Sequence, residues 1–256
     1  MEKSRDDVKM NDFSGKITLV TGSSRGIGRA AGLKLASLGA KVFFHGVKES
    51  DYLRSAVAEA GNQAEFLTGD FGNMDVVKKI ADTLKGRNLI PDILVLNASV
   101  QSYTGLGNFD SGEFIRMFQT NVESSFVLLH KLMPEMRKRN SGRVIFVGSI
   151  NGIKPASRLA VYGAAKAALM NLAKTAALEN APYGITVNTI LPGVIETDRN
   201  AAVLSDASFA DNLRKQIPMH RFGTSEECAE LIAFLASDCA GYITGSEISI
   251  SGGWQL

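Results

Sequence analysis

The sequence of 256 residues contains little cysteine and histidine: two of the first and three of the second. Two cysteines cannot build the disulfide framework of a small secreted domain, and they suit a reducing compartment such as the cytoplasm. None of the five residues has the spacing typical of metal ligands, so we expect no metal site.

Charge of one sign and long hydrophobic runs are also lacking. The chain has 28 Lys and Arg against 26 Asp and Glu, a formal net charge of +2, and no long basic run, so we expect no nucleic-acid partner. The most apolar long stretch, 159–178, contains Lys166 and Lys174 and should not span a membrane. Residues 1–12 alternate charges without an apolar segment, which predicts a mobile tail rather than a secretory signal.

Short runs rich in β-branched residues alternate with longer helical patterns from residue 13 onward, and no repeat or linker marks a second domain. This alternation predicts one doubly wound, Rossmann-type α/β domain over residues 13–256, with a parallel sheet. Seven strands are expected, at 17–20, 41–45, 64–67, 93–96, 143–147, 185–190 and 247–250.

Helices are expected at 26–38, 50–60, 73–85, 111–139, 160–181 and 225–237. Pro134 should kink or divide the fourth of them, because proline lacks the amide hydrogen that a helix needs. Residues 193–222 show no strong period until late, which indicates a flexible insertion over a site.

A glycine-rich turn, Thr21-Gly22-Ser23-Ser24-Arg25-Gly26-Ile27-Gly28, directly follows the first predicted strand and begins the first helix. A pyrophosphate group needs close approach of the backbone, which Cβ atoms would block, and free N–H groups at a helix N-terminus. The alternative is a strand-to-helix turn that binds nothing. The position between strand and helix favours the nucleotide site.

A second set of residues carries reaction chemistry. Ser149 ends the fifth predicted strand, Tyr162 begins the next helix thirteen residues later, and Lys166 follows four residues on, on the same helix face. A phenol is a poor acid or base at pH 7 unless a nearby ammonium favours its ionised form, and Lys166 can supply that charge. Ser149 can donate to the substrate oxygen, and Tyr162 can give a proton to a carbonyl or take one from an alcohol.

The spacing Gly-x3-Gly-x-Gly, together with Ser149, Tyr162 and Lys166, resembles the short-chain dehydrogenase/reductase family over residues 13–255. Motif by motif, the resemblance is closest to 3-oxoacyl-[acyl-carrier-protein] reductases. It implies an active NAD(P)-dependent oxidoreductase. It also implies that Asn121 completes a catalytic tetrad with Ser149, Tyr162 and Lys166 by holding a water that links the lysine to solvent.

The resemblance further assigns cofactor contacts. It implies an adenine contact at Asp70, a nucleotide-binding turn at Asn97-Ala98-Ser99 and a nicotinamide-facing segment at 192–197. Ser99 replaces the glycine of the family pattern, so its side chain either crowds the nucleotide or points away. The expected cofactor-binding residues are Gly22, Ser24, Arg25, Ile27, Gly28, Lys48, Asp70, Phe71, Asn97, Ala98, Ser99, Tyr162, Lys166, Pro192, Gly193, Ile195 and Thr197.

The second predicted strand decides the nucleotide. NAD binding favours an acidic residue at its end, where the sequence reads His45-Gly46-Val47-Lys48. Arg25 and Lys48 could both reach a 2′-phosphate, which predicts NADP(H), with NAD(H) as the alternative if Glu49 or Asp51 turns back toward the site.

The substrate stays open at this stage. The acyl-carrier docking pair of the resembling reductases could be matched by Arg137 or Arg139, but its second member falls on Leu178. Small ketones, keto-sugars and steroids remain candidates beside 3-oxoacyl thioesters. The alternatives to a ketone reductase are an NAD-linked alcohol or sugar dehydrogenase working oxidatively and a non-catalytic nucleotide-binding regulator. The resemblance implies a homotetramer, with the 159–178 helix in an interface.

Overall fold

The computed structural model describes residues 12–108 and 110–256, and these fold around one sheet. The tail predicted at 1–12 lies outside the described residues except for Asp12. Every neighbouring pair of strands is parallel, and the strand order is β3-β2-β1-β4-β5-β6-β7, which confirms the predicted doubly wound sheet. The strands are β1 (Ile17–Val20), β2 (Lys41–Gly46), β3 (Glu65–Thr68), β4 (Ile93–Leu96), β5 (Gly142–Val147), β6 (Ile185–Pro192) and β7 (Glu247–Ile250).

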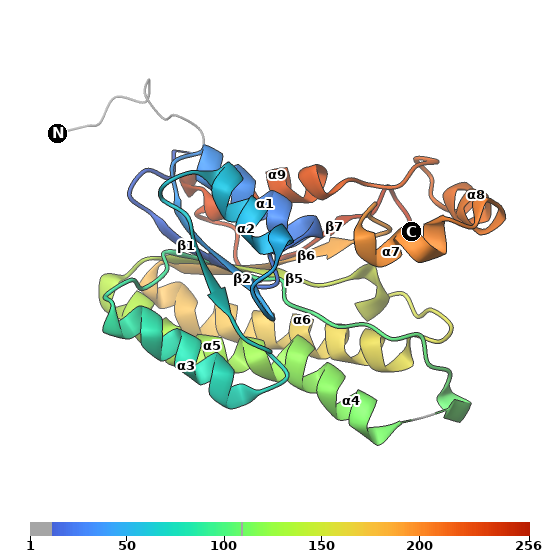
Figure 1. The fold of residues 1–256 in the computed structure, drawn as a ribbon, viewed down its shortest axis with the longest axis horizontal. Helices are drawn as coiled ribbons and strands as arrows, with labels where there is room; N and C mark the ends of the chain where they lie inside the picture. Colours follow the sequence, from blue (N-terminus) through green and yellow to red (C-terminus); the bar gives the residue numbers. More distant parts are fainter. Residues whose placement is uncertain (1–11, 109) are drawn as a thin grey trace.

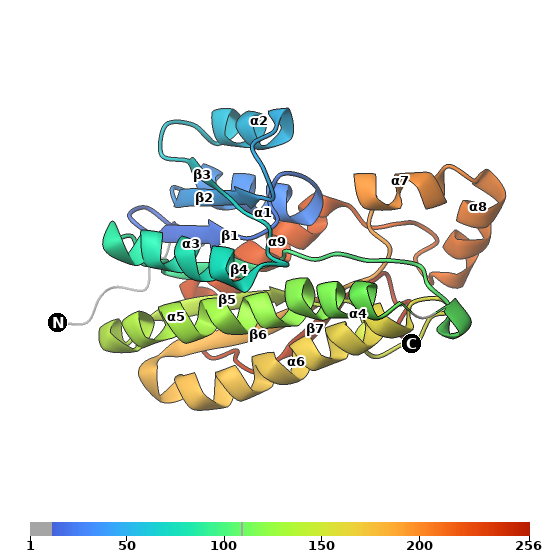
Figure 2. The same ribbon diagram turned by 60° about the horizontal axis from the view of Figure 1, so that its bottom comes forward.

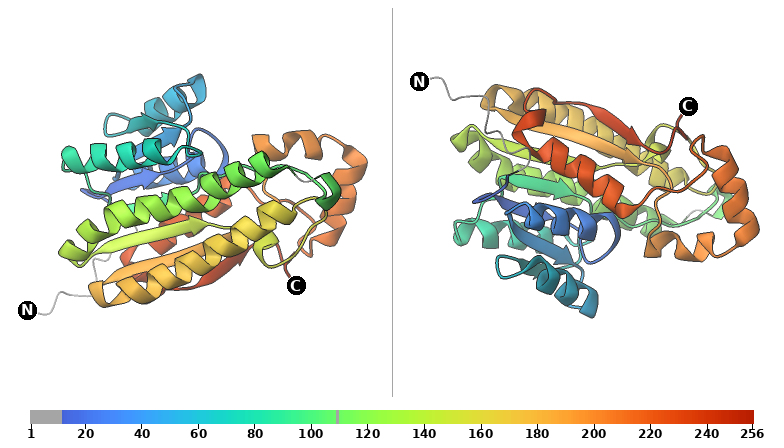
Figure 3. Two further views of the ribbon diagram at one scale, coloured as in Figure 1. Left: turned by 90° about the horizontal axis from the view of Figure 1, so that it is seen from below. Right: turned by 90° about the horizontal axis from the view of Figure 1, so that it is seen from above.

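Helices cover both faces of the sheet (Figures 1 and 3). One face carries α1 (Gly26–Ser37), α2 (Asp51–Ala60) and α9 (Ser225–Ala236), and the other carries α3 (Met74–Gly86), α4 (Ser111–Phe118), α5 (Ser124–Arg139) and α6 (Ala160–Asn180). Because a parallel sheet is buried on both faces, its strands are apolar throughout, and two separate clusters of buried side chains fill the layers above and below it.

The helical pattern at 111–139 is divided, but not at the predicted place. A π-helical turn at η3 (Gln119–Glu123) separates α4 from α5, whereas Pro134 lies inside α5. Proline at 134 removes the helical donor to the carbonyl of His130, an exposed residue that water can reach. The division therefore arises from the π-turn that carries Asn121, a type of turn frequent at functional sites.

Residues 193–222 hold two short helices that the sequence pattern did not predict. They are α7 (Asp198–Leu204) and α8 (Ala207–Gln216), and they lie beyond the carboxyl ends of the strands, near the C-terminus (Figure 2). The side chain of Asp206 caps α8 by accepting from the Phe209 amide. Ala210, Ile217 and Phe222 form a small buried cluster that fixes this segment.

The remaining helical turns are 3₁₀: η2 (Leu106–Asn108), η4 (Ile150–Gly152), η5 (Ala181–Tyr183) and η6 (Asp238–Ala240). No helix in the described part of the chain is long and apolar enough to cross a membrane. The direction of strand succession reverses between β1 and β4, and in open α/β sheets ligands bind in the crevice outside the strand ends at this point.

Candidate active site

A cavity of about 750 Å³ opens at the carboxyl ends of the strands, where the switch point predicts it. Gly28, Lys48 and Asn121 do not line it. The other predicted site residues do: Gly22, Ser24, Arg25, Ile27, Asp70, Phe71, Asn97, Ala98, Ser99, Ser149, Tyr162, Lys166, Pro192, Gly193, Ile195 and Thr197.

The glycine turn has the backbone that a nucleotide cradle needs. Gly22 and Gly26 have φ of 62° and 58°, values that side-chain-bearing residues rarely adopt. A Cβ on Gly28 would lie 2.4 Å from Asn97 Nδ2, so Gly28 serves close packing rather than ligand contact. No side chain caps the first turn of α1, and its N-terminus faces the cavity through Gly26 and Ile27.

His45, at the end of β2, supports this turn and was not predicted to do so. Its Nδ1 accepts a hydrogen bond from the Gly22 amide at 3.1 Å, so Nε2 carries the proton and donates to the Gly69 carbonyl at 3.0 Å. The ring also stacks on Phe71, with centroids 3.9 Å apart. Burial lowers the pKa of His45 to about 4, so the ring is neutral at pH 7.

Asn97 ties β4 to the same turn. Its side-chain amide donates to the carbonyls of Thr21 and Gly22, each at 2.9 Å, and its backbone amide donates to Thr21 Oγ1. Asn97 therefore positions the turn. The Asn97-Ala98 segment after β4 is in direct contact with the glycine turn, because a Cβ on Gly22 would lie 2.7 Å from the Ala98 Cα.

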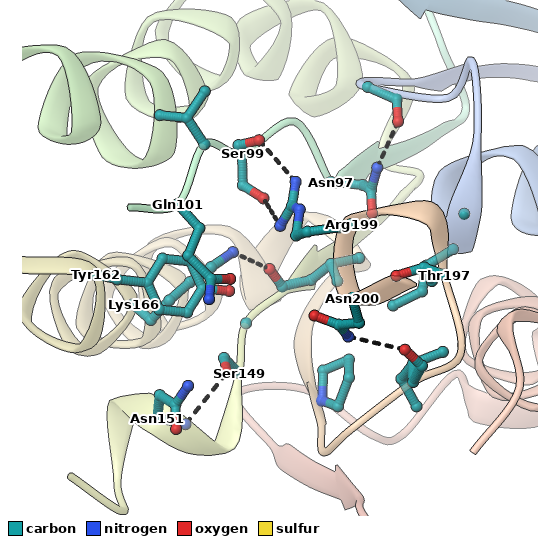
Figure 4. Close-up of a pocket in the computed structure, with 18 of the residues that line it drawn as sticks. Asn97, Ser99, Gln101, Ser149, Asn151, Tyr162, Lys166, Thr197, Arg199 and Asn200 are labelled. Atoms are coloured by element: carbon teal, nitrogen blue, oxygen red, sulfur yellow. Dashed lines mark hydrogen bonds between the residues drawn. The ribbon is translucent and has the colours of Figure 1, made fainter. Parts of the chain in front are cut away.

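Ser149, Tyr162 and Lys166 come together on one wall of the cavity (Figure 4). Ser149 is fixed by its position before η4, where its Oγ accepts from the Asn151 amide at 3.1 Å. Burial raises the pKa of the Tyr162 phenol, while Arg199 and the hydrogen bond with Ser149 act in the opposite direction. The phenol therefore keeps its proton at neutral pH.

Lys166 lies 2% exposed beneath the tyrosine, and its Nζ donates to the Val147 carbonyl at 2.7 Å. Burial and, after it, the positive charge of Arg199 lower the pKa of this ammonium to about 7. The site thus holds one amine that titrates near neutrality beside one protonated phenol, and such shifted groups in a cavity are typical of functional sites.

Asn121 sits in the π-turn of η3, 1% exposed. Its Oδ1 accepts from the Val100 amide at 2.7 Å, and its Nδ2 donates to the Val100 carbonyl at 2.9 Å. Both side-chain groups are thereby engaged with the loop after β4, so Asn121 ties η3 to that loop.

Asp70 and Arg116 form an ion pair at the cavity margin, and the arginine was not predicted. Asp70 Oδ1 accepts from the Gly72 amide at 2.9 Å, and Arg116 Nη1 donates to Oδ2 at 3.1 Å. The Gly72 hydrogen bond and, after it, Arg116 lower the pKa of Asp70. Both oxygens of the Asp70 carboxylate are therefore engaged within the chain, and its orientation is fixed.

Arg199, in the first turn of α7, is the third cavity-lining residue, after His45 and Arg116, that sequence reasoning missed. It reaches into the cavity and donates to the hydroxyl and to the carbonyl of Ser99, each at 2.8 Å (Figure 4). The side chain of Ser99, which departs from the family pattern, thus points to Arg199. The serine at position 99, where the family pattern has glycine, was the feature of the sequence that could have indicated this contact.

The residues around the end of β2 bear on the nucleotide. Arg25 lines the cavity, exposed, beside the glycine turn. Glu49 and Asp51, the two acids that could favour NAD, are both paired with Arg54 at 2.8 Å, and neither lines the cavity. The end of β2 therefore presents no free carboxylate to the site.

Comparison with known proteins agrees with this geometry. The family model described as enoyl-(acyl carrier protein) reductase matches residues 22–255. The 3-oxoacyl-[acyl-carrier-protein] reductase FabG of Escherichia coli (strain K12) is 39% identical over 246 residues, which cover 96% of this chain and 99% of the relative.

Two solved structures are similar throughout. The NADP-bound 3-oxoacyl (acyl-carrier-protein) reductase of Agrobacterium tumefaciens C58 has a TM-score of 0.90 and 34% identity, covering 95% of this chain and 96% of its own. A mutant short-chain dehydrogenase/reductase of Serratia marcescens has a TM-score of 0.89 and 33% identity, with coverages of 96% and 100%. The chain therefore belongs to the short-chain dehydrogenase/reductase family of oxidoreductases.

Proposed function

We propose that this protein reduces a ketone to a secondary alcohol with a hydride from NADPH, with Tyr162 as the proton donor. The observation that carries the proposal is the convergence of Ser149, Tyr162 and Lys166 on the cavity that the glycine turn also lines. Family membership and the NADP-bound relative support the same chemistry.

The residues present fit a dinucleotide. The glycine turn lines the cavity with backbone conformations that side-chain-bearing residues rarely adopt, and α1 begins there without a capping side chain. NADPH, when bound, supplies the hydride. Arg25 and Lys48 would hold the 2′-phosphate, and Asp70 would hold the adenine. The 192–197 segment would hold the nicotinamide, since it lies beside the glycine turn: Thr197 Cγ2 is 3.4 Å from where a Cβ on Gly26 would be.

The chain's own residues then handle the proton. The buried phenol of Tyr162 remains protonated at pH 7 and gives its proton to the carbonyl oxygen as that oxygen becomes negative. The Ser149 hydroxyl donates to the same oxygen and stabilises its developing charge. The ammonium of Lys166, below the ring, favours the phenolate that remains, and it is the group from which the phenol is reprotonated.

The basic cluster at the end of α5 argues against a dedicated carrier-docking surface. Arg137 donates to Asn180 Oδ1 at 2.6 Å, and Arg139 donates to the carbonyls of Ile90 and Pro91. Leu178 is 79% exposed where the docking pair of the resembling reductases would need a second basic residue. A 3-oxoacyl thioester is therefore one substrate to test among free ketones.

Assembly as a homotetramer is part of the proposal. The outer face of the α4 to α6 layer exposes Ile115, Phe126 and Leu178, at 54%, 56% and 79%, and burying such side chains between copies is favourable (Figure 3, left). The free cysteines, Cys228 buried and Cys239 exposed, are consistent with a cytoplasmic location. The mass in solution, measured by light scattering, tests the assembly.

The decisive experiment is a panel of ketones, keto-sugars, steroids and 3-oxoacyl thioesters, assayed with NADPH and with NADH. We expect reduction of at least one ketone with a kcat/KM for NADPH at least tenfold that for NADH. Preferential oxidation of alcohols with NAD would support the dehydrogenase alternative. Tight NADPH binding without turnover of any substrate would support a non-catalytic regulator.

A further inference from the structure

We propose that Arg199 forms a carboxylate-binding subsite next to Tyr162, and that the substrate is a 2-oxo or 3-oxo acid rather than an uncharged ketone. This inference rests on the proposed ketone reduction and names the substrate class. It arises from one arginine that enters the reacting end of the cavity without a carboxylate partner among the described residues.

The position of the guanidinium defines the subsite. Arg199 and Tyr162 line the same cavity, and the guanidinium is held there by its two hydrogen bonds to Ser99. Figure 4 shows Arg199 extending from α7 toward Ser99 on the side of the cavity that also holds Tyr162, Lys166 and Gln101. A ketone oxygen on Tyr162 would therefore bring a group one or two carbons away to Arg199.

The chemistry of the contacts leaves the positive charge available. A guanidinium has five N–H donors. Two serve the hydroxyl and the carbonyl of Ser99, which are uncharged and cannot neutralise it. The donors that remain match the two oxygens of a carboxylate.

The surrounding charges favour an anion as well. Lys166 lines the same cavity, and its pKa is lowered first by burial and second by the positive charge of Arg199, so the two cations repel each other in the absence of a negative group. Asp198, the adjacent acid on the cavity wall, makes no ion pair with Arg199 within the described ranges. A bound carboxylate would relieve this repulsion, whereas an alkyl chain would not.

Two sources of negative charge are distinguishable: a substrate carboxylate and the phosphates of the nucleotide. The phosphates are expected over the glycine turn, where Thr197 packs against Gly26. Arg199 instead contacts Ser99 and lines the cavity together with Tyr162. The geometry therefore favours the substrate, and the experiment needs separate arms for the two.

The first arm uses matched pairs that differ only in charge: pyruvate against methyl pyruvate, and acetoacetate against methyl acetoacetate. We expect the native chain to have a kcat/KM for an acid about 10- to 100-fold above that for its ester, as a charge-assisted hydrogen bond allows. Arg199→Gln should abolish this preference by lowering the rate with the acid, and Arg199→Lys should retain part of it. Arg158→Gln is the matched control, because Arg158 is exposed nearby, held by the Tyr103 carbonyl, and does not line the cavity.

The second arm needs no turnover. Oxamate, an unreactive analogue of pyruvate, should raise the melting temperature of the NADP-bound native chain and of Arg158→Gln, but not that of Arg199→Gln. Neutral ethyl oxamate should have no effect on any of them. NADPH affinity, followed by nucleotide fluorescence, should change less than threefold in Arg199→Gln.

The outcomes separate the hypotheses. Equal rates with acid and ester in the native chain, or no oxamate effect, would overturn the subsite. Equal losses with acid and ester in Arg199→Gln, together with weakened NADPH binding, would assign Arg199 to the nucleotide phosphates and also overturn it. If no ketone in the wider panel is reduced, the proposed function fails, yet an oxamate effect that depends on Arg199 would still establish the anion site.

Discussion

The ammonium nitrogen of Lys166 lies 5.6 Å from the centre of the Tyr162 ring, one helical turn along α6. Both side chains are almost completely buried, and both line the cavity. Burial penalises the charged form of each group: it lowers the pKa of Lys166 to about 7 and raises that of Tyr162. This arrangement gives measurable consequences for stability and for turnover.

The depressed pKa of Lys166 predicts a pH-dependent stability. Between about pH 7 and its ordinary pKa of 10.5, the unfolded chain binds a proton on this amine that the folded chain does not. Stability therefore rises with pH in that window, and the cost of the buried charge is greatest below pH 7. We expect the native chain to gain about 2 kcal/mol relative to Lys166→Met between pH 7 and 9 in urea unfolding.

Lys174→Met is the control for this measurement, since Lys174 lies on the same helix but is exposed and pairs with Glu247 at 2.7 Å. Its stability should follow the native pH curve. Parallel curves for the native chain and Lys166→Met would contradict the shift.

Removing the Tyr162 hydroxyl should abolish turnover while leaving the nucleotide site intact. Phenylalanine keeps the ring that packs in this 6% exposed position but cannot donate a proton, and a general acid contributes about 10²- to 10⁴-fold to the rate. We expect Tyr162→Phe to lose at least 100-fold in kcat and to retain the NADPH dissociation constant, measured by fluorescence titration. Tyr52→Phe, at a 60% exposed position on α2, should behave as the native chain does; substantial residual activity in Tyr162→Phe would assign the proton to another group.

The sequence alone was enough to predict those strands, turns and side-chain pairs that depend only on residues close together in the chain. Four-residue runs such as Ile93–Leu96 form buried strands because a parallel sheet covered on both faces requires uninterrupted apolar side chains. The spacing of Tyr162 and Lys166 placed both on the cavity wall, since residues four apart share a helix face. The glycine turn lies at the predicted junction between β1 and α1, because its glycines directly follow an apolar strand pattern and precede a helical one.

Contacts between distant segments were beyond such patterns. Arg199 meets Ser99 only because two loops converge at the sheet edge, and no periodicity marks either residue. His45 lies near the end of β2 with no distinguishing sequence pattern, and only the folded structure shows that its Nδ1 accepts a hydrogen bond from the Gly22 amide. The division at η3 was missed because a π-turn depends on its tertiary contact, the bond between Asn121 and Val100, rather than on a helix-breaking residue.

The nucleotide preference should depend on Arg25. This side chain lines the cavity and is exposed, whereas Lys48 does not line it, so Arg25 is the better placed to bind a 2′-phosphate. We expect Arg25→Ala to raise the dissociation constant of NADPH about 10- to 100-fold, with a smaller effect of Lys48→Ala, and little change for NADH in either. Arg29→Ala is the control, because Arg29 pairs with Glu59 outside this cavity; equal losses for both nucleotides in Arg25→Ala would disprove the assignment.

Acid should destabilise the protein through His45. The unfolded chain protonates this histidine near pH 6.5, while the folded chain resists until about pH 4, so stability is lost as the pH falls through that interval. We expect a contribution of about 2 kcal/mol between pH 7 and 4.5, measured by urea unfolding and absent in His45→Gln. His130→Gln should keep the native pH dependence, since His130 is exposed on α5; the same curve in His45→Gln would show that another group is responsible.

Replacing Ser99 by glycine tests how Arg199 is held. Ser99→Gly removes the hydroxyl acceptor and leaves the carbonyl, so the guanidinium loses one of its two fixed contacts and must be ordered again when an acid binds. We expect the preference for oxo acids over their esters to fall about 3- to 10-fold, mainly through the KM of the acid, because the guanidinium is less well pre-oriented for the carboxylate. The Ser99 hydroxyl already points to Arg199, so NADPH affinity should be unchanged, and Ser102→Ala should alter neither quantity. If Ser99→Gly instead bound NADPH much more tightly, the serine would be crowding the nucleotide, and its contact with Arg199 would be incidental to substrate choice.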